Sequence, residues 1–436
     1  MLKCARPIKH PGKCHTELRP KDHKVIENGG YPGPAEEEEE YDTLMIVTLC
    51  QAKTRLYGMD DASQLWNHTL DEFLVGLGLE SCPMESCLYI RKTVEGFYIM
   101  LIVYVDDYLY AGNNANMLIK FHKAMSKRFK VKVSDDPSLY IGYEIQQKPG
   151  KIFVNQEVYV SKLAETFEVV DAKTQKVPME PKLILQPAAE TLDDKRLYQA
   201  VVGSMMYANG TTRPDISFAT NQLSRQNANP GKEHLTYGKR VLKYLLDTKC
   251  HGLLFQRQDV LKLEGHVDSE YAGDTEDRRS VTGWLVSLNG TPVMWNTKKH
   301  PIVTTSSTEA EYVGYTIIAK SVAWIRNVLD FMGFTQREPT IVWVDNQGAI
   351  KIAENPKQHG RTKHIDVRYH YIREKILDKT ITLAYLSTDQ MIADMLTKAL
   401  DRVKFERFRD AIMETSIGGS NHVKFDIVET SIEGRC

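Results

Sequence analysis

The sequence predicts a multidomain protein that combines the α+β and α/β fold classes. Three observations support this: strand-like runs dominate residues 87–111, helical patterns dominate residues 195–250, and strands alternate with helices after residue 261. The chain has 436 residues, which predicts two or three domains at roughly 150 residues per domain. Its hydrophobic fraction of 42% and charged fraction of 26% exclude a chain that is mostly disordered or fibrous.

Charge and hydropathy restrict the partners. The chain carries 56 Lys and Arg residues against 57 Asp and Glu, so its net charge is −1 and any nucleic acid must be held by local basic patches. The longest apolar run, Phe97–Val105, is far shorter than the ~20 residues of a membrane-spanning helix. The N-terminal region also lacks the apolar core of a signal peptide. We therefore expect no membrane partner and an intracellular location, in the cytoplasm or the nucleus.

The first segment, residues 1–48, receives no predicted fold, because Pro and Gly breaks and an acidic run interrupt its apolar patterns. Four of its residues are of the types found in a zinc knuckle but lack a standard ligand spacing: Cys4, His10, Cys14 and His15. Thiols in an unstructured segment are the favoured interpretation. The seven cysteines of the chain favour reduced thiols over a disulfide framework.

The second segment, residues 49–177, is predicted to mix helices and strands. A helix is expected over Ala62–Gly76, and turns at Glu95-Gly96 and Asp106-Asp107 should join three strands in a meander: Cys87–Lys92, Phe97–Val105 and Tyr108–Ala111. A helix, a strand and a second helix are expected further along: Phe121–Phe129, Lys151–Val154 and Val158–Phe167.

The third segment, residues 178–252, is predicted to be a linker followed by a helical connection. Its first part, Pro178–Asp194, is polar and contains prolines, and the helical part is broken at Arg213-Pro214 and at Asn229-Pro230-Gly231. No residue of this segment is assigned any chemistry.

The fourth segment, residues 253–400, is predicted to follow the order βββαβααβα. The expected elements are strands Leu261–Val267, Ser280–Leu288 and Pro292–Asn296, a long helix Thr308–Met332, strand Thr340–Val344, a short helix ending at Ala353, a basic helix His364–Leu377, strand Thr380–Leu386 and helix Gln390–Leu400. Residues 401–436 are predicted to hold a basic helix, Lys404–Met413, and a polar tail.

Two adjacent carboxylates mark the first candidate site. In LIVYVDDYLYAG, an apolar strand delivers Asp106 and Asp107 into a tight turn. Adjacent carboxylates are costly to hold together without a cation, which suggests a divalent metal, although aspartate also favours turns for its own reasons. Together with LYGMDDASQLW at Leu56–Trp66 and LDEFL at Leu70–Leu74, the Tyr-Val-Asp-Asp turn resembles the reverse transcriptases of copia-type retrotransposons.

The resemblance implies a palm and thumb in residues 49–177 and metal-binding roles for the two turn aspartates. In that family a third aspartate on an earlier strand completes the metal site, and nothing in residues 1–48 resembles that strand. Asp42 stands at the wrong end of its apolar run. Asp60 and Asp61 replace a base and an amide of the family pattern, which should repel an incoming triphosphate. We therefore expect a truncated, degenerate reverse transcriptase without polymerase activity.

Four spaced acids mark the second candidate site. Residues 253–400 resemble the RNase H domain of the same elements, and the acids at its catalytic positions are Asp268, Glu311, Asp345 and Asp394. The resemblance implies that they converge and hold two Mg²⁺ ions, with Mn²⁺ as an alternative, for hydrolysis by a metal-activated water. Each acid also has a purely structural interpretation: a strand end, a capping box with Thr308, a helix cap and a solvated helix position, respectively. Glu309 is the rival of Glu311.

A basic segment, RTKHIDVRYHYIREK at residues 361–375, is the candidate nucleic-acid surface. Its mixture of cations and tyrosines suits contacts with phosphates, for which we expect Arg361, Lys363, Arg368 and Arg373. A solvated helix is the alternative, and it is favoured over a metal site built from His364, Asp366 and His370.

The sequence therefore predicts a fragment of a copia-type retrotransposon Pol polyprotein, with RNase H activity on RNA–DNA hybrids as its leading function. An RNA-directed DNA polymerase and a decayed product that only binds nucleic acid are the competing hypotheses. Residues 253–413 are expected to fold alone. The sequence assigns no oligomeric state.

Overall fold

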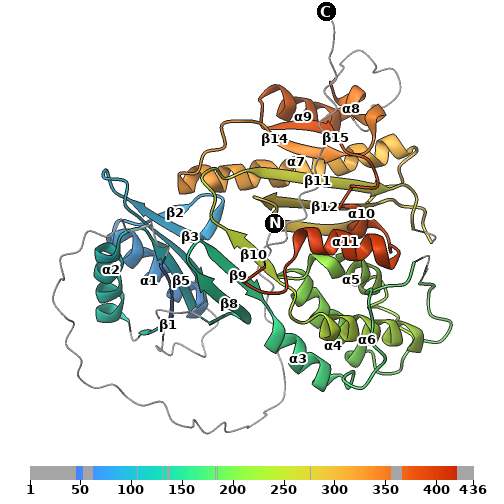
Figure 1. Ribbon diagram of the computed structural model, residues 1–436, viewed down its shortest axis with the longest axis horizontal. Helices are drawn as coiled ribbons and strands as arrows, with labels where there is room; N and C mark the ends of the chain where they lie inside the picture. Colours follow the sequence, from blue (N-terminus) through green and yellow to red (C-terminus); the bar gives the residue numbers. More distant parts are fainter. Residues whose placement is uncertain are drawn as a thin grey trace, which may run out of the picture. The chain divides into compact units, whose positions relative to one another are not determined.

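The computed structural model describes residues 46–52, 62–105, 107–129, 131–134, 138–181, 183, 185–274, 276–354 and 366–419, and side chains for all of these except 46–52, 62–65, 131–134 and 366–369. Three β-sheets and a group of helices make up this part of the chain (Figure 1). The mixed fold class expected from the sequence is confirmed.

The first sheet has six strands in the order β2-β3-β4-β5-β1-β6. The predicted meander is confirmed as three antiparallel strands: β3 (Glu85–Lys92), β4 (Tyr98–Tyr104) and β5 (Asp107–Gly112). The remaining strands are β1 (Ile46–Ala52), β2 (Glu80–Cys82) and β6 (Val131–Ser134). Helices α1 (Ala62–Gly76) and α2 (Ala115–Arg128) add apolar residues to the core of this sheet, among them Leu74 and Phe121.

The second sheet has four strands in the order β10-β9-β8-β7: β7 (Leu139–Tyr140), β8 (Tyr143–Lys148), β9 (Lys151–Asn155) and β10 (Leu253–Gln256). Strand β10 pairs antiparallel with β9, so Leu253 lies opposite Val154. The first residues of the predicted fourth segment therefore complete a sheet that begins in the second segment.

The helical connection follows helix α3 (Glu157–Thr166) and comprises α4 (Arg196–Asn209), a 3₁₀ turn (Pro214–Ile216), α5 (Ser217–Ser224) and α6 (Lys232–Asp247). Both predicted breaks, at Arg213-Pro214 and Asn229-Pro230-Gly231, lie between these helices, because proline lacks the N–H that continues a helix. The described part of residues 178–194 contains no helix or strand.

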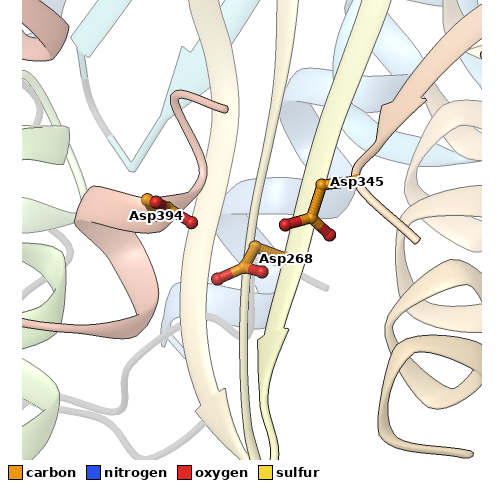
Figure 2. Close-up of side chains that lie close together, drawn as sticks. All are labelled: Asp268, Asp345 and Asp394. Carbon is orange, nitrogen blue, oxygen red and sulfur yellow. The ribbon is translucent and has the colours of Figure 1, made fainter. Parts of the chain in front are cut away.

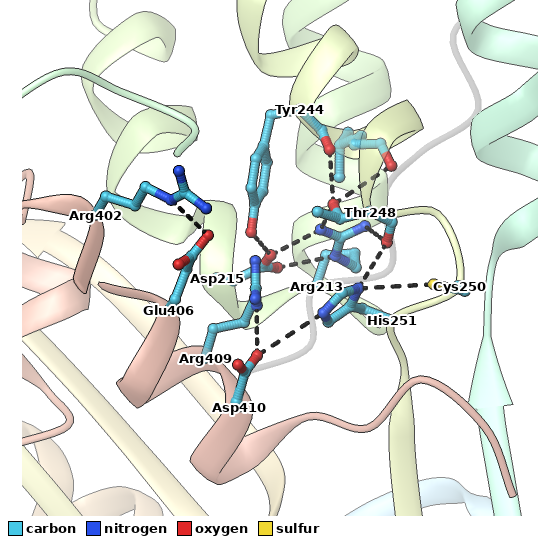
Figure 3. A network of polar contacts seen from close by, with 11 residues as sticks. Arg213, Asp215, Tyr244, Thr248, Cys250, His251, Arg402, Glu406, Arg409 and Asp410 are labelled. Atoms are coloured by element: carbon cyan, nitrogen blue, oxygen red, sulfur yellow. Dashed lines mark hydrogen bonds and ion pairs between the residues drawn. The ribbon is translucent and has the colours of Figure 1, made fainter. Parts of the chain in front are cut away.

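A buried polar network joins parts of this connection to one another (Figure 3). The Arg213 guanidinium donates to both oxygens of Asp215, at 2.9 and 2.7 Å, and to the carbonyl and hydroxyl oxygens of Thr248, at 3.1 and 2.6 Å. The Tyr244 hydroxyl donates to Asp215 Oδ2 at 2.6 Å. Burial acts to raise the pKa of Asp215, but Arg213 and Tyr244 hold it below its ordinary value. The pair is therefore ionised inside the core.

The third sheet has the order β13-β12-β11-β14-β15, with β11, β14 and β15 parallel and the other pairs antiparallel. Its strands are β11 (Leu263–Glu270), β12 (Val281–Leu288), β13 (Thr291–Lys299), β14 (Thr340–Val344) and β15 (Ile381–Tyr385). Helices α7 (Ser307–Met332), α8 (Gln347–Glu354) and α9 (Asp366–Leu377) share its core. The order βββαβααβα is confirmed, and this is an RNase H-like fold.

The last predicted helix, Gln390–Leu400, is much shorter in the structure. Only α10 (Asp394–Thr397) is helical, and Lys398 is extended, with φ −147° and ψ 158°. Residues 387–396 instead make i to i+3 turns, such as the bond from the Asp394 N–H to the Met391 carbonyl at 3.1 Å. Tertiary packing overrides the helical periodicity here: the segment turns so that seven consecutive residues, Met391–Thr397, are all buried.

One hydrophobic core joins the connection to the C-terminal helices. Residues of α4 and α6 pack with α10 and with α11 (Arg402–Ile412), as Figure 1 shows for α11 beside α4, α5 and α6. The ring of Tyr244 meets that of Phe405 edge-on, with centroids 5.9 Å apart. Excising residues 253–413 would expose this core to water, so the structure argues against the expectation that this piece folds alone.

No helix in the described ranges is long and apolar enough to cross a membrane.

Candidate metal centre

Three of the four predicted acids of the RNase H-like fold come together. Asp268, Asp345 and Asp394 each offer a carboxylate oxygen, and these oxygens all lie within 4.8 Å of one another. Figure 2 shows the three carboxyl groups turned toward a common point from β11, from the end of β14 and from α10. Two of the three side chains are buried.

Close packing of α10 on the sheet places Asp394 next to Asp268. A Cβ atom at Gly283, which pairs with Asp268 on the neighbouring strand, would lie 2.5 Å from Leu396. Glycine is therefore required at this position for α10 to approach β12. The Thr397 hydroxyl completes the junction by donating to Asp268 Oδ2.

Glu311 is a fourth carboxylate, and it is buried. It is 5% exposed, and its Oε2 is buried without a hydrogen-bond partner in the described part of the chain. The Ser269 N–H donates to Glu311, and the carboxylates of Asp268 and Asp345 are close enough to affect its ionisation. Gly314, one turn later, lets α7 approach β11, since a Cβ there would lie 2.7 Å from Ser269 Oγ.

Glu309 has a different position from its rival. The N-cap of α7 is Ser306, whose hydroxyl accepts from the Glu309 N–H at 3.1 Å. The Glu309 carboxylate accepts from the N–H and hydroxyl of Thr305, at 2.6 and 2.7 Å. Glu309 therefore serves the helix start, so the capping-box interpretation of Glu311 with Thr308 is wrong.

The residue that caps α8 is likewise not the predicted acid but its neighbour in the sequence. The Asn346 side chain, and not Asp345, accepts from the Ala349 N–H at 2.9 Å. Asp345 Oδ2 instead accepts from the Thr388 hydroxyl at 3.0 Å. Asp345 is thus left facing the other acids.

The electrostatics of the cluster favour a bound cation. Burial raises the pKa of Asp268 to about 7, against the opposing effect of Lys398. Burial also holds the pKa of Glu311 well above its ordinary value, and the charges of Asp268 and Asp345 add to this effect. Carboxylates that are costly to ionise together are stabilised by a divalent ion.

Two lysines reach the cluster, and sequence reasoning missed both. Lys398 Nζ lies 2.9 Å from Asp394 Oδ1 and 3.8 Å from Asp268 Oδ2. Lys404 Nζ lies 2.7 Å from Asp394 Oδ2. Burial acts to lower the pKa of Lys398, but Asp268 and Asp394 raise it above its ordinary value. The spacing of four residues between Asp394 and Lys398 is the sequence signal that could have indicated this pair.

The hairpin of the first sheet is described only in part. Asp107 begins β5 and lies opposite Tyr104, while Asp106 falls outside the described residues. Val105 has a φ of 57°, which a β-branched residue rarely adopts. Its carbonyl accepts from the Trp66 indole at 2.7 Å, so Trp66 supports the turn that follows the apolar strand.

The predicted phosphate-binding residues are also described in part. Arg361 and Lys363 lie outside the described residues, and Arg368 lies in α9 without a described side chain. Arg373 is half-buried in α9 and donates to the Ile352 carbonyl at 3.1 Å. One of its N–H groups therefore joins α9 to α8, and its contact with phosphate stays a prediction.

Two relatives match most of the chain. The retrovirus-related Pol polyprotein from transposon TNT 1-94 of Nicotiana tabacum is 35% identical over 373 residues, which cover 84% of this chain and 28% of that protein. The one from transposon RE1 of Arabidopsis thaliana is 34% identical over 371 residues, which cover 85% of this chain and 25% of that protein. The chain belongs to the copia-type Pol polyprotein family.

The copia-type chain spans about a quarter of the length of these relatives. Its residues 38–181 match the family described as reverse transcriptase (RNA-dependent DNA polymerase). Among solved structures, the foamy viral protease-reverse transcriptase in complex with dsDNA is similar over 79% of this chain and 68% of that chain, with 14% identity and a TM-score of 0.40.

Proposed function

We propose that the chain is a Mg²⁺-dependent ribonuclease that cleaves the RNA strand of RNA–DNA hybrids, with Mn²⁺ as an alternative ion. The observation that carries the proposal is the convergence of Asp268, Asp345 and Asp394 on an RNase H-like sheet. The partnerless Glu311 Oε2 fits a metal ligand, because hard cations such as Mg²⁺ prefer carboxylate oxygens.

The chain's own residues would prepare the site in two ways. The four carboxylates would hold the metal ions, and bound ions would supply an activated water and stabilisation of the leaving oxygen. The Thr397 and Thr388 hydroxyls orient Asp268 and Asp345. No histidine occupies residues 387–389 before α10, so no protein acid-base group is assigned there.

The test is cleavage of a labelled hybrid by the full chain. We expect cleavage of the RNA strand in Mg²⁺, none in EDTA, and none of a DNA duplex of the same sequence, since the 2′-hydroxyl distinguishes RNA from DNA. The Asp345→Asn chain, purified in the same way, controls for contaminating nuclease. If neither Mg²⁺ nor Mn²⁺ gives cleavage above this control, a non-catalytic nucleic-acid-binding product takes the place of the ribonuclease.

The same preparation should not extend a primer on an RNA template. Asp107 joins no group of three metal-ligating side chains in the described ranges, and Gln51 rather than an acid pairs with it on β1. A polymerase site needs enough carboxylates to hold two ions. Incorporation of labelled nucleotide is the measurement. Template-dependent incorporation that is lost on Asp107→Asn would restore the polymerase.

A further inference from the structure

Both oxygens of Asp394 are already in contact with cations of this chain. Lys398 Nζ lies 2.9 Å from Oδ1, and Lys404 Nζ lies 2.7 Å from Oδ2. The Asp394 side chain is completely buried. A divalent ion that takes Asp394 as a ligand must therefore compete with at least one ammonium group.

The two lysines are held differently. Lys404 stands on α11, donates to the Thr388 carbonyl at 3.0 Å, and lies 5.4 Å from the centre of the Phe408 ring, which is part of the shared core. Its side chain is 20% exposed. These contacts fix Lys404, and through it one oxygen of Asp394, irrespective of what binds at the cluster.

Lys398 makes fewer contacts than Lys404, and its side chain is more exposed to solvent. It follows the last residue of α10 in an extended conformation, and its side chain is 36% exposed. Besides Asp394, the second acceptor within ion-pair distance is Asp268 Oδ2, at 3.8 Å. Its ammonium group thus lies between two of the three aspartates that would hold a metal ion.

We propose that Lys398 is a tethered cation of the acidic cluster that a divalent ion displaces on binding, whereas Lys404 is a positioning residue that holds Asp394 in place. This proposal rests on the proposed metal-dependent function. It explains how the buried carboxylates of Asp268 and Asp394 remain together, since an unpaired buried charge is strongly unfavourable. It also implies that the chain weakens its own affinity for metal.

The size of this effect follows from the fraction of molecules in which Lys398 has left the carboxylates. The apparent dissociation constant is the intrinsic constant divided by that fraction. If the ammonium occupies the cluster about nine-tenths of the time, then removing it should lower the apparent dissociation constant about tenfold.

The experiment is calorimetric titration of the full chain with Mn²⁺, without nucleic acid. We expect K398M to bind about tenfold more tightly than the wild type, and K398R, which keeps the charge, to bind like the wild type. K404M should bind more weakly, because Asp394 loses the contact that fixes it. K351M, which removes an exposed lysine of α8, should leave the affinity unchanged.

Each alternative result has a definite meaning. An unchanged or weaker affinity in K398M, with circular dichroism showing a folded chain, would overturn the displacement proposal while leaving the metal site intact. An equal gain in Mn²⁺ affinity in K404M would show that the loss of either nearby positive charge has the same effect. It would also overturn the displacement proposal. If the wild type and K398M bind no more Mn²⁺ than Asp345→Asn, the metal site itself, and with it the proposed nuclease, is refuted.

Discussion

Replacing Asp345 with asparagine is expected to lower hybrid cleavage by the full chain at least a hundredfold while preserving hybrid binding. Asparagine keeps the size of the side chain and an acceptor for the Thr388 hydroxyl, but removes the charge that holds metal. Metal ions contribute several kcal/mol of transition-state stabilisation, and about 1.4 kcal/mol corresponds to a factor of ten in rate. Single-turnover cleavage and fluorescence anisotropy with a labelled hybrid measure the two properties.

The two glutamates in the first turns of α7, Glu309 and Glu311, provide a matched pair for the same assay. Glu311→Gln should lose about as much activity as Asp345→Asn, because its buried Oε2 has no hydrogen-bond partner among the described residues and the charges of Asp268 and Asp345 affect its ionisation. Glu309→Gln should change the rate less than about threefold, since the Glu309 carboxylate mainly stabilises the start of the helix. A larger loss at Glu309 than at Glu311 would reverse the assignment of the fourth ligand.

Replacing Arg213 with methionine is expected to cost about 3–5 kcal/mol of the free energy of unfolding. The side chains of Arg213 and Asp215 are 1% and 0% exposed, so the substitution leaves an ionised carboxylate buried without its partner. Urea denaturation monitored by circular dichroism gives the value, with the slope of the transition checking that the unfolding process is the same.

Arg196 and Asp194 form the natural control for this experiment. They have the same two-residue spacing and the same bidentate geometry, but the Arg196 side chain is 89% exposed. Arg196→Met should leave the unfolding free energy nearly unchanged, because water screens an exposed pair. Equal losses in the two variants would show that the Arg213 network has no special role in stability.

Much of the site was predictable because two of its acids lie near the ends of predicted strands. Asp268 lies on β11, and Asp345 directly follows the parallel neighbouring strand β14. Strand patterns locate such residues well because their periodicity is local. Asp394 was predicted to lie near them only through the family resemblance. The structure has mostly turns where a helix was expected around this residue. The choice of Glu311 over Glu309 depended on the large apolar residue that follows it, Tyr312.

The contacts that sequence patterns missed are tertiary. Lys404 reaches Asp394 because α11 packs against the connection, and no local periodicity encodes that packing. The same holds for β10, whose partner strand β9 lies about a hundred residues earlier in the chain. Such pairings depend on the closure of a long loop and on burial, and neither leaves a signature within a short window.

Helices α4, α6, α10 and α11 share one core. The proposed metal site therefore depends on the helical connection, to which no chemistry is assigned. Asp394 and Lys404 remain in place only while the connection stays packed beneath α11. Elements that share a core tend to open together in local unfolding. A disturbance in the connection, far along the chain from the acids, would thus remove a proposed metal ligand and its support in a single event.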